Sequence, residues 1–190
     1  MKSLHLMKTS TGGAWAFRLM RDLVQMGEEV HVAMPIDGTL VEQYKNAGII
    51  IHQLDYSLKN VMKTIKKIRK IVETIKPDIV HSHFVLTTIY MRIALRNFKV
   101  ARVFQVPGPL HLEHFFFRRL DILTAQKKTD FWIPTCNWVL NKYKECGIDT
   151  NRLFLTYYGG DISDKTYKKG ILRNELGLSD KDIIVGMVAY

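Results

Sequence analysis

The sequence has 190 residues, 47% of them hydrophobic and 24% charged, which is enough for one sizeable core or for one domain and part of another. No stretch approaches the roughly 20 consecutive apolar residues of a membrane-spanning helix, and the N-terminus has no apolar segment of the secretory type, so we expect a cytoplasmic protein. A formal net charge of +10 favours an anionic partner, which could be a nucleic acid, a membrane surface or a phosphorylated ligand.

The first 34 residues predict a strand, a loop, a helix and a second strand, which together make a β-α-β unit. The helix has one apolar face, formed by Ala16, Leu19, Met20, Leu23 and Val24. Gly12 and Gly13 lie where the first strand passes into the helix, and the N–H groups of a helix N-terminus can bind an anion there. The two glycines could equally serve only to let the loop turn tightly. The G-x-G-x-x-G fingerprint of a tightly bound dinucleotide is absent.

A short helix over 39–46 and a strand over 49–54 precede the clearest helix of the chain, over 58–75. Its apolar stripe comprises Leu58, Val61, Met62, Ile65, Ile68, Ile71, Val72 and Ile75. Its other face is basic and carries Lys59, Lys63, Lys66, Lys67, Arg69 and Lys70. Such a helix either packs on the core with a solvated face, which the helix alone favours, or lies on anionic lipid.

A fourth strand over 79–83 contains two histidines, His81 and His83, which lie two residues apart and so share one face. Such a pair can bind a metal, but no carboxylate or cysteine joins it locally, and we expect no metal. We expect one histidine to be packed and the other to face a cleft. His83 is the better candidate for binding a ligand, because ligands of open α/β sheets bind at the carboxyl ends of the strands.

After a helix over 86–98 and a strand over 101–106, a loop begins with Pro107, Gly108 and Pro109. His111 and Glu113 follow and could transfer protons or donate and accept hydrogen bonds there. Three phenylalanines and two arginines then fill positions 115–119. This segment is either a helix docked on the core or an aromatic and basic contact for a lipid or a lipid-linked substrate.

The rest of the chain predicts three further strands and two short helices. We expect strands over 129–135, 152–158 and 182–190, and helices over 138–146 and 172–176. The polar residues from 162 to 170 lack periodicity and are typical of a linker. Strands that alternate with helices in this way predict a doubly wound parallel sheet of the Rossmann-like α/β class.

Four features of the chain resemble the N-terminal half of GT-B-fold retaining glycosyltransferases of the family 4 type. They are the Gly12-Gly13 loop with its helix and "GEEVHVAMP", the strand "KPDIVHSHF", Asp130 before a strand, and "YYGGDIS" from Tyr157. The last residues, "DIIVGMVAY", are similar to the first strand of that family's second domain. The resemblance covers essentially the whole chain.

The resemblance implies two Rossmann-like domains that face each other across a cleft. It places the acceptor-side domain at residues 1–161, a linker at 162–181, and the first strand of a truncated donor domain at 182–190. In the family, the groups that bind the donor phosphates lie in the second domain. We therefore expect a retaining glycosyltransferase as the full-length protein, and a chain that is inactive alone.

The residues and the resemblance together give a set of candidate site residues. Those expected to bind donor or acceptor are Gly12, Gly13, His83, Pro107, Gly108, Glu113 and Asp161. Many relatives have a histidine in a T-V-H-G segment after the fifth strand, where this chain has proline at position 107. His111, four residues later, is the nearest substitute and is the candidate catalytic residue.

The implied reaction transfers a hexosyl-type sugar from a nucleotide diphosphate to a hydroxyl group, with retention at the anomeric carbon. The nucleotide-sugar is a co-substrate, and neither a cofactor nor a metal is expected. The implied acceptor is a saccharide or a lipid-linked saccharide for a cell-surface polysaccharide such as capsule or lipopolysaccharide. An enzyme peripheral to the inner face of the plasma membrane fits this role. The candidate membrane-facing residues are Lys63, Lys66, Lys67, Lys70, Phe115, Phe116, Arg118 and Arg119.

The alternative is a non-catalytic, basic α/β module that binds a nucleic acid or a membrane surface. The net charge prompts this alternative. The basic residues are spread along one helix face, however, and no recognised nucleic-acid-binding motif occurs. We therefore expect no nucleic acid among the partners.

Overall fold

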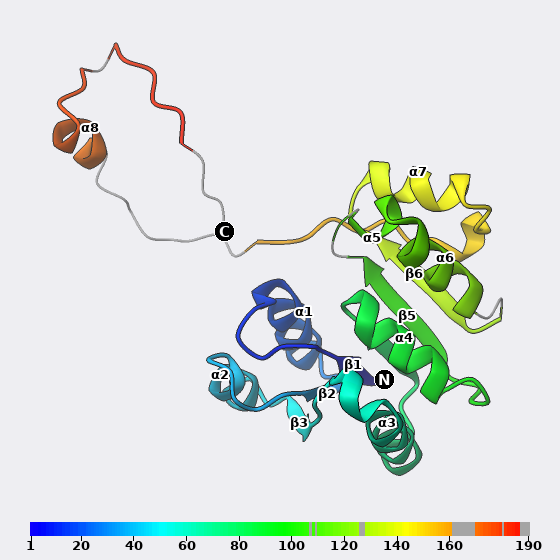
Figure 1. The fold of residues 1–190 in the computed structure, drawn as a ribbon. Coiled ribbons are helices and arrows are strands. Elements are labelled where there is room, and N and C mark those ends of the chain that lie inside the picture. The colour runs from blue at the N-terminus through cyan, green and yellow to red at the C-terminus, as the bar shows by residue number, and fades with distance from the viewer. Residues whose placement is uncertain (107, 109, 126–127, 161–169, 180, 187–190) are drawn as a thin grey trace. The chain divides into compact units, whose positions relative to one another are not determined.

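A computed structural model describes every residue except 107, 109, 126–127, 161–169, 180 and 187–190, and describes only the backbone at 58, 110 and 111. The chain divides into two compact units, residues 1–159 and residues 160–190. Figure 1 shows that the sheet and most of the helices belong to the first unit. All of the candidate site residues that the structure describes lie in that unit.

The first unit is built on a six-stranded sheet in which every neighbouring pair of strands is parallel. The strands are β1 (Lys2–Leu6), β2 (Glu29–Met34), β3 (Ile50–Gln53), β4 (Ile79–Ser82), β5 (Ala101–Val106) and β6 (Asp130–Pro134). Their order across the sheet is β3-β2-β1-β4-β5-β6, so successive strands are added toward one edge from β1 to β3 and toward the other edge from β4 to β6. This is the doubly wound parallel sheet that the alternation of strands and helices predicts.

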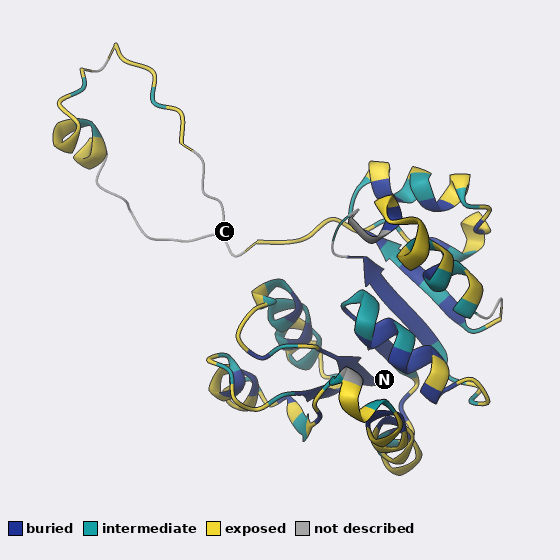
Figure 2. Cartoon of the chain, viewed as in Figure 1, coloured by how far each residue is buried: buried dark blue, intermediate teal, exposed yellow. Residues whose placement is uncertain are grey.

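Helices cover both faces of this sheet (Figure 1). The helices of the first unit are α1 (Ala14–Gln25), α2 (Val41–Asn46), α3 (Val61–Ile75), α4 (Val85–Ala94), α5 (Leu110–Glu113), α6 (Phe115–Thr124) and α7 (Asn137–Glu145), with short 3₁₀ turns η1 (Leu58–Asn60) and η2 (Thr150–Arg152). On one face, α3 and α4 pack against Leu4, Leu6 and Val80. On the other face, α1 and α2 pack against Val30 and Val32. The inner strands are accordingly buried, whereas the edge strand β3 and the outer helix faces are largely exposed or half-buried (Figure 2).

A buried network of charges fixes α6 to the sheet. The Asp121 carboxylate of α6 accepts bonds from Arg92 of α4 at 2.6 Å, from the Tyr143 hydroxyl of α7 at 2.6 Å and from the Trp132 indole of β6 at 3.2 Å. Arg92 also pairs with Asp130 of β6 at 3.2 Å. Because buried charges must be paired and hydrogen-bonded, this network specifies where α6 lies.

The predicted seventh strand over 152–158 is wrong. The chain there follows the free edge of β6, where Phe154 N–H donates to the Trp132 carbonyl at 2.9 Å and Thr156 N–H to the Pro134 carbonyl at 3.0 Å. Only Leu153 forms a bridge, and it is also the only residue of this segment that is buried. The other residues of the segment are half-buried or exposed, although Phe154 contacts Phe131 of β6 with ring centroids 6.0 Å apart.

Two smaller predictions also need correction. Met62, placed on the apolar stripe of α3, is 65% exposed, since the buried side of the helix is formed by Thr64, Ile65, Ile68 and Val72. In the second unit, α8 (Ile171–Glu175) is helical as predicted, but the described residues 182–186 form no strand. Ile183 and Val185 are almost fully exposed there, and a strand needs a paired neighbour. Whether residues 182–190 begin a second domain stays a prediction.

Candidate functional site

The candidate site lies at the carboxyl edge of the sheet, where β1 and β4 diverge. Ligands of doubly wound sheets bind at such a reversal, because the loops after the two strands turn to opposite faces and leave a crevice. In this chain the loop after β1 contains the predicted glycines, and His83 directly follows β4. The sheet topology therefore brings the glycine loop and His83, both predicted to bind a ligand, to the same edge.

The loop from Lys8 to Gly13 is held in one conformation by close backbone packing. Gly13 is the N-cap of α1 with φ +86°, a conformation that favours glycine, and a Cβ there would lie 2.8 Å from Met7 Cε. Gly38 lies directly against the loop, because a Cβ on it would come within 2.2 Å of the Ser10 carbonyl carbon. Gly12 and Lys8 are exposed, so the loop presents both backbone and positive charge at the N-terminus of α1.

A chain of hydrogen bonds between buried side chains links the ends of β1, β4 and β5. Ser3 Oγ lies 3.2 Å from His5 Nε2, His5 Nδ1 lies 2.9 Å from His83 Nε2, and His83 Nδ1 lies 3.1 Å from Gln105 Oε1. The Gln105 oxygen can only accept, so His83 donates from Nδ1 and accepts at Nε2. His5 then donates to His83 and accepts from the Ser3 hydroxyl. With both imidazoles neutral, each of these three hydrogen bonds has one donor and one acceptor.

Burial keeps these histidines neutral. It lowers the pKa of His5 and of His83 well below the usual value, and neighbouring histidines lower both further. Burial also lowers the pKa of His81 to about 3. The rings of His81 and His83 stack with their centroids 4.2 Å apart, which confirms that the two share one face of the strand.

The three histidines are also the one group of possible metal ligands among the described residues. One nitrogen from each of His5, His81 and His83 lies within 4.8 Å of the others. A metal bound by all three would have to replace the hydrogen bond between His5 Nδ1 and His83 Nε2. The geometry supports the hydrogen-bonded series Ser3, His5, His83 and Gln105, here called the relay, better than a metal centre.

Aromatic side chains cover this relay at the sheet edge. Trp15, in the first turn of α1, packs edge-on against His83 with ring centroids 5.2 Å apart and contacts Tyr158 at 4.9 Å. Arg18 of the same helix donates to the Gly159 carbonyl at 3.4 Å. The expectation that one of the two β4 histidines faces a cleft is therefore wrong: both are buried, because Trp15 lies over His83.

The remaining predicted binding residues are less well placed by the structure. Glu113 is exposed at the end of α5, and Gly108 is half-buried with open space around it. His111 belongs to α5, but the structure describes only its backbone and not its side chain. Pro107 and Asp161 lie outside the described residues altogether. The catalytic role of His111 stays a prediction.

The predicted membrane-facing residues lie on two helices. Lys63, Lys66, Lys67 and Lys70 are all exposed on α3. On α6, Phe115 and Phe116 are 64% and 68% exposed, so the helix is anchored to the core by Asp121 and yet presents aromatic rings to solvent. Among the described residues, no helix combines the length and the apolar character that crossing a bilayer requires.

Sequence reasoning missed His5, Trp15 and Gln105. His5 is a polar residue between Leu4 and Leu6 in a buried strand, and a polar side chain at such a position needs a partner, which is a signal that could have been used. Gln105 carries the same signal, because it lies between Phe104 and Val106 in a buried strand, whereas Trp15 carries none, since its role depends on contacts with distant residues.

A parallel sheet whose strand order reverses beside a glycine loop at a helix N-terminus defines a Rossmann-like domain, the unit from which GT-B glycosyltransferases are built. The profile of Glycosyltransferase Family 4 matches residues 12–164, which include both the glycine loop and the strands that follow it. The chain belongs to this family. No curated protein sequence matches it.

Solved structures agree with this assignment at the level of the fold. The chain is similar to HepE of Anabaena in complex with UDP-glucose (TM-score 0.72, 17% identity, 93% of this chain and 50% of that one). It is also similar to a glycosyltransferase of Rickettsia africae (TM-score 0.69, 16% identity, 95% and 50% of the two chains) and to MurG of Acinetobacter baumannii (TM-score 0.59, 16% identity, 85% and 47%). The chain spans about half the length of these proteins.

Proposed function

We propose that this chain is the acceptor-side half of a longer glycosyltransferase. The enzyme would move a sugar from a nucleotide diphosphate to a hydroxyl of a saccharide or a lipid-linked saccharide. The observation that carries the proposal is the family match over residues 12–164, which begins at the Gly12-Gly13 end of the loop and includes the Gly13 cap of α1 and the strands from β2 to β6. The chain alone would not catalyse transfer, because the donor phosphates would be bound by a second domain.

The donor is a nucleoside diphosphate-sugar, as in the HepE complex with UDP-glucose. Sugar transfer leaves negative charge on the departing diphosphate, and stabilising that charge is the main electrostatic task of such an enzyme. The N-terminus of α1 and the exposed Lys8 supply positive potential at the sheet edge. We further propose transfer with retention at the anomeric carbon.

The place of action is the inner face of the plasma membrane, where lipid-linked acceptors for cell-surface polysaccharides would be met. Two observations support this part of the proposal: the exposed lysines of α3 and the exposed phenylalanines of α6. Helix α4 contacts both α3 and α6, so the three helices form one layer on the same face of the sheet (Figure 1).

A pair of glycine variants in the full-length protein tests the role of the loop. Gly13→Ala forces a side chain into a left-handed backbone and toward Met7, and should displace the loop. We expect transfer to fall roughly tenfold or more, since a displacement of about 1 Å can cost on the order of 100-fold. Gly27→Ala, at φ +85° with no atom near its Cβ, is the matched control.

Gly27→Ala should destabilise the fold by a similar amount through the same backbone strain, but leave transfer by the folded fraction unchanged. Equal transfer by the two variants, corrected for folded protein, would show that the loop takes no part in the reaction. Circular dichroism measures the folded fraction, and release of nucleoside diphosphate measures transfer.

A further inference from the structure

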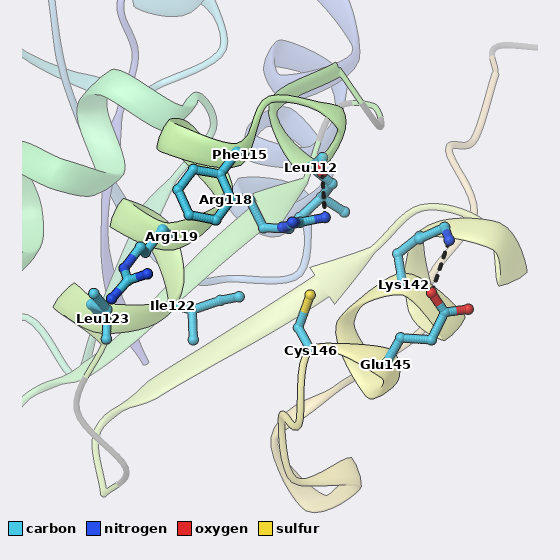
Figure 3. A pocket seen from close by; sticks show the side chains of 9 residues that line it. All are labelled: Leu112, Phe115, Arg118, Arg119, Ile122, Leu123, Lys142, Glu145 and Cys146. Carbon is cyan, nitrogen blue, oxygen red and sulfur yellow. Dashed lines mark hydrogen bonds and ion pairs between the residues drawn. The ribbon is translucent and has the colours of Figure 1, made fainter.

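A groove of about 490 Å³ runs between α6 and the C-terminal half of α7 (Figure 3). Its volume lies in the range of sites that bind single small molecules rather than extended surfaces. The groove is outside the relay and the glycine loop described above, since none of those residues lines it. Both of its walls are positioned by the buried carboxylate of Asp121, which bonds Tyr143 of α7 from its place on α6.

The groove carries an excess of positive charge. Arg118, Arg119 and Lys142 line it together with one carboxylate, Glu145, so three cations and one anion leave a net charge of +2. Glu145 is already paired with Lys142 at 2.8 Å. Among the residues that the structure describes, no carboxylate pairs with either arginine. The groove is therefore complementary to an anion.

The two arginines are held in place by weak contacts that leave their charge available. Arg118 Nη1 makes a long bond of 3.5 Å to the Leu112 carbonyl, and the Arg119 guanidinium lies 5.8 Å from the Phe115 ring. An arginine fork of this kind suits a phosphate, which can accept two parallel N–H bonds.

The remaining lining is apolar. Leu112 is buried at the base of the groove, whereas Phe115 and Leu123 are 64% and 70% exposed at its rim. Phe116, next to the groove on the same helix, is 68% exposed. A free phosphate would leave this rim in water, but a phosphate that carries a hydrocarbon chain would cover it.

The thiol of Cys146 reports on the same charges. Burial in the groove wall raises its pKa, the carboxylates of Glu145 and Asp121 raise it further, and Arg118 and Lys142 oppose the rise because their positive charges stabilise a thiolate. Two cations from different helices thus act on one point inside the groove. An anion seated between them would lie over the thiol.

We propose that the groove between α6 and α7 binds the phosphate headgroup of one anionic phospholipid of the bilayer, with its hydrocarbon chain against Phe115 and Leu123. This inference rests on the proposed function, because it names the lipid that a membrane-associated transferase would contact. The proposal is more specific than a general attraction between a basic surface and a membrane, because it assigns one site to one headgroup. Lys142 and Cys146, which sequence reasoning did not select, belong to that site.

Protection of the Cys146 thiol from a maleimide tests the proposal without any transfer assay. The experiment uses the whole chain with Cys136→Ser, so that Cys146 is the single thiol; serine is well tolerated there because residue 136 is the N-cap of α7. The probes are dihexanoyl phosphatidate below its micelle concentration, dihexanoyl phosphatidylcholine and inorganic phosphate. Phosphatidate at about ten times its Kd should slow labelling roughly tenfold.

Arg118→Gln should abolish that protection, and Arg118→Lys should retain part of it. Lys144→Gln is the charge-matched control: it removes one positive charge from an exposed position on α7 that does not line the groove, and should leave protection unchanged. Each variant is compared with and without lipid, so that any change in the intrinsic reactivity of the thiol cancels.

The proposal is overturned if phosphatidate gives no protection, if phosphatidylcholine protects equally, or if inorganic phosphate alone protects as well as phosphatidate. Equal loss with Arg118→Gln and Lys144→Gln would also overturn it, because that result would indicate net charge and not a site. Protection of the thiol in this chain, together with no sugar transfer by the full-length protein, would contradict the proposed function while supporting the lipid site.

Discussion

At the scale of single residues, the buried histidines predict how the stability of the fold changes with pH. His5, His81 and His83 have pKa values lowered by burial, so below pH 6.5 the unfolded chain binds protons that the folded chain does not. The stability that these residues contribute is complete above about pH 6.5 and is lost as the pH falls, by about 1.4 kcal/mol per pH unit for each histidine.

The measurement is the urea midpoint of unfolding between about pH 7 and pH 5, a window above the titration of ordinary carboxylates. His81→Gln removes one of four described histidines whose pKa is lowered in the fold, the fourth being the half-buried His52, so the slope of stability against pH should fall by roughly a quarter to a third. His114→Gln, at an exposed position, should leave the slope unchanged. A slope that is the same in all three proteins would contradict the burial of a neutral His81.

The same residues show what a single sequence can and cannot predict. His83 was singled out because it follows a strand, and the structure confirms its place at the sheet edge but not its exposure. His5 could have been found as a polar residue in an apolar strand. The contact of Trp15 with His83 could not, because it joins residues 68 positions apart and depends on how α1 packs.

At the scale of elements, Asp121 is predicted to decide whether α6 stays docked. Asp121→Asn leaves Arg92 with a weakened partner in a buried site and disturbs bonds to Trp132 and Tyr143. Removing one partner of a buried pair costs about 3–5 kcal/mol, so we expect a loss of that order in the free energy of unfolding. Hydrogen exchange in α6 should rise as well.

Asp22→Asn is the matched control for this prediction. Asp22 also pairs with an arginine, Arg21, but on the exposed side of α1, where such pairs contribute about 0–1 kcal/mol. A loss of similar size in both variants, or an unchanged exchange rate in α6 with Asp121→Asn, would contradict the anchoring role.

Element boundaries were predictable where hydrophobic patterning decides them. The strand over 101–106 is found at the predicted bounds, since every residue from Arg102 to Val106 is buried on one face or the other of the sheet. The strand over 152–158 failed because only Leu153 finds a place in the core. Patterning shows that a segment is apolar, but not whether a second layer exists to cover it.

At the scale of the whole molecule, the charge of the first unit predicts how it meets a membrane. Replacing Lys63, Lys66, Lys67 and Lys70 by glutamine should weaken binding to anionic vesicles on the order of 100-fold or more, because each lysine near a charged surface contributes favourably. Vesicle sedimentation measures this, with neutral vesicles as the reference. Unchanged binding would show that α3 does not face the membrane.

The architecture of the first unit bears on the proposed division of labour between two domains. The sheet, both helix layers and the buried network are complete within residues 1–159. The solved structures that share this fold are about twice as long, and one of them is a complex with UDP-glucose. In the function proposed above, a second domain would supply the groups that bind the donor phosphates and this chain would present the acceptor edge, so we expect the chain to be inactive alone.

The most direct test is transfer by the full-length protein that contains this chain, assayed with UDP-glucose and other nucleoside diphosphate-sugars against saccharide and lipid-linked acceptors. We expect a glycosylated acceptor with retained anomeric configuration, release of nucleoside diphosphate only when acceptor is present, and no transfer by the 190-residue chain alone. Consumption of nucleotide-sugar with no acceptor glycosylated, or transfer by the 190-residue chain by itself, would contradict this expectation.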